Sequence, residues 1–221
     1  MKLNRQTKLI YLITSGQSDP QTTPTTKDFT NVLRLIDAAV VAEVDLVQIR
    51  ENLLTAKALY ELTEAAARIT RESSTRLLVN DRADIAASAG ADGVHLRTNS
   101  LSPDVVRNAF GEQFLIGAST HSLSEASTAR DQGADFVVLG PVFATSSKQK
   151  YGEPLGLAQL SEVASKLSPF PVLALGGIKS ANAASCIRAG ASGVAAIGML
   201  SDPLQLQSVV TEIRSRFNES D

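Results

Sequence analysis

The sequence predicts an α/β fold, a single (β/α)8 barrel of the TIM type that spans residues 1–221, and three observations support this fold class. Short apolar runs alternate with segments of helical periodicity along the whole chain. A weak repeat recurs at 89–96, 132–139 and 189–196, where a helix end, a glycine, a short turn and an apolar strand follow one another. The length of 221 residues suits one such barrel with a sizeable core. A doubly wound open sheet is the alternative.

The first half of the chain supplies four strand and helix pairs. Runs of Val, Leu and Ile predict the strands, and apolar residues at spacings of three and four predict the helices. These pairs are expected at 8–14 and 29–42, 45–50 and 55–72, 76–79 and 83–89, and 93–96 and 102–110. The polar segment 15–28 after the first strand is expected to be a loop within the domain, because it is rich in threonine and proline. Asp28 at its end is placed to cap the first helix.

The second half repeats the same arrangement. Its strand and helix pairs are expected at 114–118 and 122–132, 136–139 and 157–167, 172–175 and 180–189, and 194–197 and 203–217. In a barrel of this class the active groups lie on the loops that follow the strands. Polar side chains and glycines follow most of the predicted strands, so we expect them to gather at one rim.

Charge and cysteine content exclude several classes of protein. The chain has 21 basic and 23 acidic residues, so no nucleic-acid-binding surface is expected. Its single cysteine, Cys186, excludes an intrachain disulfide and fits a reducing cytosol. Residues 1–8 lack the apolar core of a signal peptide, and no apolar run is long enough to cross a membrane. We therefore expect a cytoplasmic protein without a membrane partner, and a homo-oligomer is compatible with this composition.

Polar groups end the second and third predicted strands. Gln48 and Arg50 alternate with apolar residues, so both point to one face, which in a closed barrel can be the interior. A buried arginine requires an anionic partner, and this is either Glu51 beside it or an anionic ligand. Asp81 follows the third strand, where it is either a metal ligand or a cap for the next helix.

Glycines and donors after the last three strands predict an anion site. Gly140 follows the strand at 136–139 and lets backbone approach a ligand closely. Donors without negative charge come next, at Thr145, Ser146, Ser147 and Lys148. An ordinary polar surface loop is the alternative. Gly177 and Gly198 follow the last two strands, where backbone N–H groups and helix N-termini can form a phosphate pocket. A phosphate monoester is therefore expected as part of the ligand.

The two histidines differ in their predicted roles. His95 lies within the strand at 93–96 and is expected to be a structural histidine with satisfied hydrogen bonds. His121 follows a strand end, where its ring can reach the barrel mouth and move a proton near neutral pH. The alternative is that Ser119 or Ser122 caps the next helix and His121 has no catalytic task.

Six runs in the sequence resemble the motifs of a known family. They are VQIRE at 47–51, VNDR at 79–82, AGADGVHL at 89–96, GASTHSLSEA at 117–126, GPVFATSSK at 140–148 and ALGGI at 174–178. Each motif is modest alone, but they occur in order and with fitting spacing from the second strand to the seventh. On these runs the sequence resembles the thiamine phosphate synthase and TenI family.

The resemblance implies a thiamine-biosynthesis enzyme on a TIM barrel. Synthases of the family couple an aminopyrimidine methyl diphosphate with thiazole phosphate and release pyrophosphate, assisted by Mg2+. The implied diphosphate and pyrimidine contacts are Gln48, Arg50, Asn80, Ser119 and Lys148. The implied metal ligand is Asp81, and the implied thiazole phosphate contacts are Thr145, Ser146, Ser147, Gly177, Ile197 and Gly198. Loss of pyrophosphate leaves a stabilised cation, so the protein mainly has to neutralise the leaving group, with Arg50 and Lys148 as its cations.

Two positions depart from the synthase pattern. The synthases usually carry a lysine two residues after the arginine, and this chain has Asn52 there. They also usually carry a second metal-binding aspartate, and this chain has Ser100 at that position. Arg97 can offset some charge, but a serine does not replace the electrostatic pull of a carboxylate on Mg2+.

Three functions remain compatible with the sequence. We favour the synthase, because most of its residues are present. The alternative is a TenI-type thiazole tautomerase, which keeps the thiazole phosphate pocket and uses a histidine at the position of His121 as acid and base to aromatise the thiazole carboxylate phosphate. The pair Asn80 and Asp81 stands against it, since a tautomerase has no evident use for them. A non-catalytic barrel that binds thiamine precursors is the third interpretation.

Overall fold

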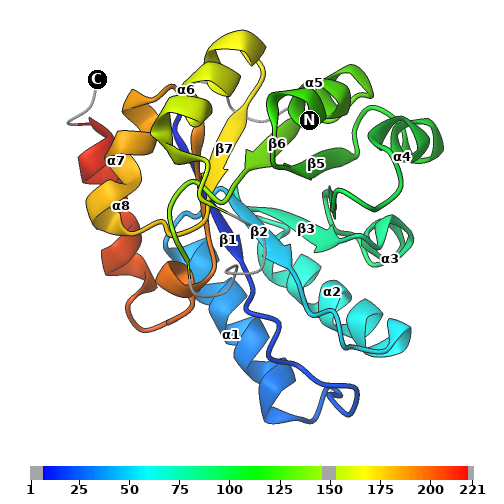
Figure 1. Cartoon of the computed structure of the whole chain (residues 1–221). Helices are drawn as coiled ribbons and strands as arrows, with labels where there is room; N and C mark the ends of the chain where they lie inside the picture. The colour runs from blue at the N-terminus through cyan, green and yellow to red at the C-terminus, as the bar shows by residue number, and fades with distance from the viewer. Residues whose placement is uncertain (1–6, 146–152, 219–221) are drawn as a thin grey trace.

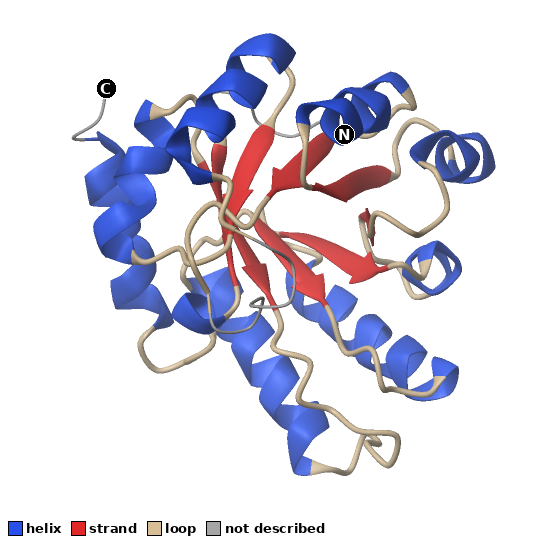
Figure 2. Ribbon diagram, in the orientation of Figure 1, coloured by secondary structure: helices blue, strands red, loops and turns tan. Residues whose placement is uncertain are grey.

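The protein is a closed (β/α)8 barrel (Figure 1) in a computed structural model that describes residues 7–145 and 153–218. The parallel strands pair in chain order, and β1 (Leu9–Ile13) closes the ring by pairing with β8 (Gly193–Ala196). Figure 2 shows the strands at the centre and the helices around them. The predicted fold class is confirmed. Within the described ranges, no helix is long and apolar enough to cross a membrane.

The remaining elements follow the predicted alternation. The other strands are β2 (Leu46–Ile49), β3 (Arg76–Asn80), β4 (Gly93–Leu96), β5 (Leu115–Thr120), β6 (Phe136–Leu139) and β7 (Val172–Leu175). The helices are α1 (Lys27–Val41), α2 (Ala56–Thr70), α3 (Ala83–Ser88), α4 (Pro103–Phe110), α5 (Leu123–Asp131), α6 (Gly156–Leu167), α7 (Ser180–Arg188), the short 3-10 helix η2 (Gly198–Leu200) and α8 (Leu206–Asn218).

Two apolar cores lie on the two sides of the strands. The barrel interior contains Tyr11 and Phe136, whose rings meet edge to face with centroids 5.7 Å apart. Val47 and Ile49 of β2 point outward and pack in the core between strands and helices. Gln48 between them is buried and contacts Tyr11 inside the barrel. The period of two predicted for this strand is therefore present, and it carries a polar side chain into the interior.

Aspartates tie neighbouring strands together at the end of the barrel opposite the mouth, and two of them, Asp92 and Asp135, belong to the repeat found in the sequence. An aspartate stands just before β2, β4 and β6, and its carboxylate accepts a backbone N–H from the preceding strand. These bonds run from Ile10 to Asp45 at 2.7 Å, from Leu77 to Asp92 at 2.8 Å and from Ile116 to Asp135 at 2.8 Å. Each of the three carboxylates also pairs with an arginine, namely Arg214, Arg76 and Arg107.

Most predicted bounds differ from the structure by one or two residues, and the differences at β5 and α8 have identifiable causes. Strand β5 continues to Thr120, two residues beyond the predicted end, because its polar side chains find partners on the neighbouring strands: Ser119 contacts His95 of β4, and the Thr120 hydroxyl donates to the carbonyl of Val138 of β6 at 3.2 Å. Helix α8 begins at Leu206 and not at residue 203. The carboxylate of Asp202 accepts the N–H of Leu204 at 2.9 Å, and this turn delays the helix.

The first helix begins earlier than predicted. It starts at Lys27, with Thr26 in the cap position, so Asp28 lies inside its first turn. The predicted capping role of Asp28 was wrong. A carboxylate in the first turn still favours the helix, because it lies near the positive end of the helix dipole.

Candidate active site

A cavity of about 510 Å³ opens where the barrel strands end. Its lining residues are Ile13, Gln48, Arg50, Asn52, Asn80, His95, Arg97, Thr98, Asn99, Ser119, His121, Leu175 and Ile197. The predicted contacts of strands β2, β3 and β5 are therefore brought together. Two guanidinium groups and no carboxylate are among these described lining residues, so the wall favours an anionic ligand.

A second cavity of about 190 Å³ lies beside the last two strands. It is lined by Thr145, Leu175, Gly176, Gly177, Ile178, Ala195, Ala196, Ile197, Gly198 and Met199. Four of the predicted thiazole phosphate contacts thus meet in one place. Leu175 and Ile197 line both cavities, so the two cavities share a wall.

Gly177 and Gly198 serve the second cavity in different ways. Gly177 has a φ of +63°, and an added Cβ would lie 2.6 Å from the carbonyl oxygen of Ala144. Only glycine therefore lets the segment after β6 pack against the end of β7. An added Cβ at Gly198 would meet nothing within 4 Å, so its backbone stays open on that side. The close approach that Gly140 permits is to β7, since its added Cβ would lie 2.3 Å from the Leu175 carbonyl oxygen.

The segment after β6 is held by both neighbouring strands. The N–H of Gly140 donates to the carbonyl of Thr120 at 3.1 Å, and the N–H of Val142 donates to that of Leu175 at 2.8 Å. Thr145 follows and reaches the second cavity. The other predicted donors of this segment lie outside the described residues; they are Ser146, Ser147 and Lys148.

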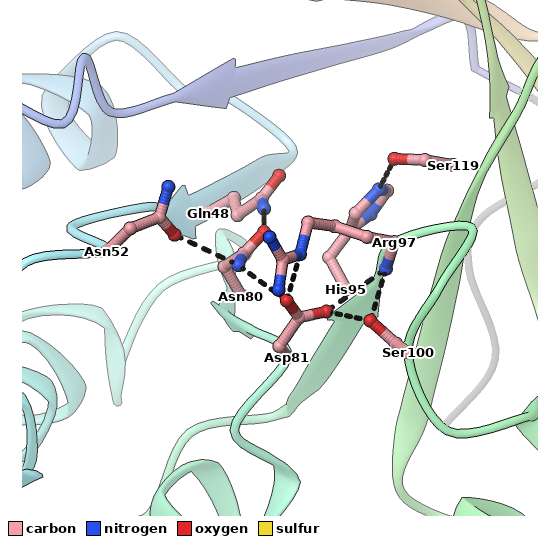
Figure 3. A network of polar contacts seen from close by, with 8 residues as sticks. All are labelled: Gln48, Asn52, Asn80, Asp81, His95, Arg97, Ser100 and Ser119. Carbon is pink, nitrogen blue, oxygen red and sulfur yellow. Dashed lines mark hydrogen bonds and ion pairs between the residues drawn. The ribbon is translucent and has the colours of Figure 1, made fainter.

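Hydrogen bonds link five strands across the floor of the larger cavity, and Figure 3 shows those that do not involve Tyr11. The contacts are Ser119 Oγ with His95 Nε2 at 2.9 Å, His95 Nδ1 with Tyr11 Oη at 3.2 Å, Tyr11 Oη with Gln48 Oε1 at 3.2 Å, Gln48 Nε2 with Asn80 Oδ1 at 2.9 Å, and Asn80 Nδ2 with Asp81 Oδ2 at 3.2 Å.

The carboxylate of Asp81 fixes the direction of this chain, because an ionised carboxylate only accepts hydrogen bonds. Asn80 must turn its amide nitrogen toward Asp81, so its oxygen faces Gln48. Gln48 then donates to that oxygen and offers its own oxygen to the hydroxyl of Tyr11. The second N–H of the Asn80 amide donates to Asn52 Oδ1 at 3.2 Å.

The same direction continues through His95 to Ser119. The Tyr11 hydroxyl donates its hydrogen bond to Gln48, so its oxygen accepts one from Nδ1 of His95. With its hydrogen on Nδ1, the ring accepts a hydrogen bond at Nε2 from the Ser119 hydroxyl. Burial lowers the pKa of His95 from 6.5 to about 4, so the ring is neutral near pH 7. The prediction of a structural histidine with satisfied bonds is confirmed. Because the Ser119 hydroxyl donates its hydrogen to His95, only the lone pairs of its oxygen are available to a ligand in the cavity.

Asp81 lies at the edge of this network in an uncommon backbone conformation, with a φ of +58°. Its Oδ1 accepts the Arg97 backbone N–H at 3.1 Å and the Ser100 hydroxyl. Its Oδ2 accepts Nε of Arg97 and the Asn80 amide. Helix α3 begins after Arg82 without a side-chain cap, so the alternative that Asp81 caps this helix was wrong.

The residues around Asp81 do not fit Mg2+. This ion requires oxygen ligands in near-octahedral geometry, usually including one or two carboxylates. Each oxygen of Asp81 already accepts two hydrogen bonds. One of these four bonds comes from the cationic side chain of Arg97. Ser100, at the position of the second aspartate, donates to Asp81. In residues 7–145 and 153–218, no group of three or more His, Cys, Asp or Glu side chains is arranged to hold a metal.

Glu51 and Arg50 are not partners. The carboxylate of Glu51 is buried and accepts the N–H of Gly16 at 3.1 Å and that of Ser18 at 3.0 Å. Glu51 therefore anchors the loop after β1, and the alternative that it pairs with Arg50 was wrong. The Arg50 guanidinium lines the cavity and makes no hydrogen bond or ion pair with another described residue. Of the two partners proposed from the sequence, an anionic ligand remains.

His121 lies at the cavity wall with a defined tautomer. Its Nδ1 contacts the carbonyl oxygen of Gly140, which only accepts, so Nδ1 carries the hydrogen and Nε2 of the neutral ring is unprotonated. Ser122 caps helix α5, because its hydroxyl accepts the N–H of Glu125 at 3.2 Å. Capping by Ser122 is therefore confirmed, but His121 still lines the cavity.

Some lining residues were given no role from the sequence. Thr98 and Asn99 belong to the polar run after β4, in which only Arg97 and Ser100 were considered. Their polar side chains just after a predicted strand could have identified them as residues of the site. The apolar wall that includes Leu175 gave no such signal, because a leucine at the end of a buried strand resembles any core residue.

The likeness to known proteins agrees with this geometry. A family model described as "Thiamine monophosphate synthase" (TMP-TENI) matches residues 10–200. The "Thiamine-phosphate synthase" of Methanoculleus marisnigri is 40% identical over 179 residues, which cover 81% of this chain and 84% of that protein. The protein of the same name from Roseiflexus sp. is 39% identical over 163 residues, covering 74% and 69%. The structure of a thiamine phosphate pyrophosphorylase from Pyrococcus furiosus aligns over 98% of both chains, with a TM-score of 0.78 and 27% identity. The chain belongs to the thiamine monophosphate synthase family.

Proposed function

We propose that this protein is a transferase of thiamine biosynthesis that couples the aminopyrimidine methyl diphosphate with thiazole phosphate, giving thiamine phosphate and pyrophosphate. The observation that carries the proposal is the pair of cavities that share Leu175 and Ile197 as a wall. Two phosphorylated substrates can occupy them with their reacting ends at that wall. A cytoplasmic location belongs to the proposal, and the free thiol of Cys186 favours it.

The reaction requires a nucleophile, a leaving group and cations that neutralise the negative charge on the departing pyrophosphate. The thiazole nitrogen forms a bond to the pyrimidine methylene carbon, and the bond from that carbon to the diphosphate oxygen breaks with its electrons going to pyrophosphate. Arg50 is placed to neutralise this charge, because its guanidinium lines the larger cavity. Lys148 is its proposed second cation. Because the residues around Asp81 do not fit Mg2+, no step is assigned to a metal.

The floor of the larger cavity suits the pyrimidine ring. Gln48 and Asn80 hold each other in fixed orientations, and Ser119 presents lone pairs to the cavity. An amino group on the ring offers the N–H that such an acceptor needs. The neutral imidazole of His95 keeps the Ser119 hydroxyl in this orientation.

The smaller cavity suits the thiazole phosphate. Gly177 and Gly198 give it a wall of backbone rather than side chains, and backbone N–H groups at the start of helices bind phosphate without a cationic side chain. Thr145 adds a hydroxyl, and Ile197 provides an apolar surface for the ring. The expected contribution of Ser146 and Ser147 stays a prediction.

The proposal is tested by incubating the purified protein with both substrates, with and without MgCl2, and measuring thiamine phosphate and pyrophosphate. We expect Arg50→Met to lower kcat/KM by about tenfold or more, because a charged hydrogen bond to the leaving group is lost. Arg82→Met is the matched control, since this exposed arginine pairs with Asp84 and lines neither cavity. Binding of both substrates without product would contradict the transferase and support a non-catalytic barrel.

Thiazole tautomerisation is the second candidate, because His121 lines the cavity and its contact with the Gly140 carbonyl leaves Nε2, and not Nδ1, as the nitrogen that can act as a base. This nitrogen can take a proton and return it, as aromatisation of the thiazole carboxylate phosphate requires. His121→Ala would then abolish isomerisation, whereas it would lower the coupling rate only modestly. Isomerisation by the purified protein, without thiamine phosphate formation, would replace the transferase by the tautomerase.

A further inference from the structure

Arg97 stands beside Asp81 with one edge of its guanidinium bound and the other open (Figure 3). Its Nε donates to Oδ2 of Asp81, and its backbone N–H donates to Oδ1 at 3.1 Å. Its two η nitrogens make no hydrogen bond with any described residue. The side chain is 56% exposed, against 16% for Asp81, and it lines the larger cavity. The open edge of the guanidinium is therefore available to a ligand.

The neighbours of Asp81 hold this arrangement in place. Ser100 donates to one oxygen and Asn80 to the other, so each oxygen accepts two hydrogen bonds. A carboxylate has about four acceptor positions, and here all are used. A magnesium ion that binds Asp81 would have to displace the Arg97 guanidinium, and it would find a serine hydroxyl where a second carboxylate is needed. Aspartate at position 100 would instead favour the ion.

We propose that Arg97 takes the place of a metal ion in this half of the cavity and binds the substrate diphosphate through its η N–H groups without Mg2+. The inference rests on the proposed function, because it assumes a diphosphate ligand. Arginine suits this task, since its planar guanidinium binds phosphate oxygens in pairs and keeps its charge at any physiological pH. Arg50 lines the same cavity, so two guanidinium groups can contact one diphosphate.

Calorimetric titration of the full-length protein with inorganic pyrophosphate, in EDTA and then in MgCl2, tests the inference. We expect the unsubstituted protein to bind pyrophosphate in EDTA, and Arg97→Met to raise the Kd by about tenfold or more. Arg82→Met is the matched control and should leave the Kd unchanged, because Arg82 pairs with Asp84 and is not among the residues that line the cavity. A melting temperature close to that of the parent shows that each variant is folded. Binding only in MgCl2, or an unchanged Kd for a folded Arg97→Met, overturns the inference.

A second variant tests whether pyrophosphate binding comes to depend on Mg2+ when Arg97 is removed and a carboxylate is added. Arg97→Ala combined with Ser100→Asp removes the guanidinium and places a second carboxylate beside Asp81. We expect this double variant to bind pyrophosphate weakly in EDTA and to regain affinity in MgCl2, while the parent gains little from the ion. A parent and a double variant with the same response to MgCl2 would contradict the assignment of Arg97 as the replacement for the metal.

Failure of this inference and failure of the proposed function give different results. If the chain couples its two substrates but requires Mg2+ and tolerates Arg97→Met, the function stands and the role of Arg97 is wrong. If pyrophosphate binds in EDTA through Arg97 but no thiamine phosphate forms, the anion site stands and the coupling function is wrong.

Discussion

One ionised carboxylate sets the orientation of polar groups across the floor of the larger cavity. Because Asp81 only accepts, the amides of Asn80 and Gln48 each have one allowed orientation, and the Ser119 hydroxyl ends the chain as a donor to His95. Sequence motifs placed Gln48, Asn80 and Ser119 at the site. They did not predict that Ser119 offers lone pairs to a ligand, because that depends on a chain of contacts between residues far apart in the sequence.

His95 makes the stability of the protein depend on pH. Its pKa is about 4 in the folded protein because of burial, against 6.5 for the free side chain. Between these values the unfolded chain binds a proton that the folded protein does not, so the contribution is complete above pH 6.5 and is lost as the pH falls toward 4. We expect the free energy of unfolding to fall by about 2 kcal/mol more in the parent than in His95→Gln between about pH 7 and pH 4.5.

Urea unfolding of both proteins at the two pH values measures this difference. The comparison uses the change with pH within each protein, so any loss of packing caused by the substitution cancels. Carboxylates that titrate in the same range are shared by both proteins and also cancel. An equal fall in both proteins would show that His95 is protonated in the folded state, contrary to its burial.

At the scale of the elements, short apolar runs explain why several strands could be predicted closely. Strands β4, β6 and β7 have the bounds expected from the sequence. Strands β6 and β7 are unbroken apolar runs, and in β4 the polar His95 lies between two buried apolar residues, Val94 and Leu96. Strand β5 was predicted to end too early, because its last two residues are polar and are held by hydrogen bonds, Ser119 to His95 inside the barrel and Thr120 to the backbone carbonyl of Val138. A pattern of hydrophobicity does not identify such residues as part of a strand.

Arg107 on helix α4 is expected to stabilise the junction between β5 and β6. It donates to the carbonyl of Gly133 at 2.9 Å, to that of Phe114 at 2.7 Å and to the carboxylate of Asp135 at 2.7 Å. Its side chain is only 12% exposed, so its loss removes hydrogen bonds from three partly buried acceptors, of which Asp135 keeps the N–H of Ile116. We expect Arg107→Ala to lower the free energy of unfolding by about 3 kcal/mol.

Denaturant unfolding measures this loss, and Arg130→Ala on helix α5 is the matched control. Arg130 also pairs with an aspartate, Asp131, but both side chains are exposed, so a change within about 0.5 kcal/mol is expected. Equal losses in the two variants would show that the network around Arg107 adds nothing beyond a surface ion pair.

At the scale of the whole molecule, barrel closure brings together residues that are far apart in the chain. The prediction of a rim of polar residues and glycines followed from counting strand ends, and the structure places these residues around two cavities. The division into two cavities was not predicted, since it depends on where the side chains of Leu175 and Ile197 lie between them. That wall is where two bound substrates would meet, so it should affect coupling more than the binding of either phosphate group.

Ile197→Phe tests this arrangement. The larger ring would fill space on both sides of the wall, so the reacting atoms could not approach each other, and near-attack geometry is lost with displacements of about 1 Å. Inorganic pyrophosphate should still bind with a Kd close to that of the parent, because its proposed partners Arg50 and Arg97 belong to the β2 and β4 side of the mouth. We therefore expect coupling to fall by about a hundredfold while the calorimetric Kd for pyrophosphate changes less than about threefold. If coupling and pyrophosphate binding were lost together, the cavities would act as one site. If coupling were unchanged, the substrates would react elsewhere in the mouth.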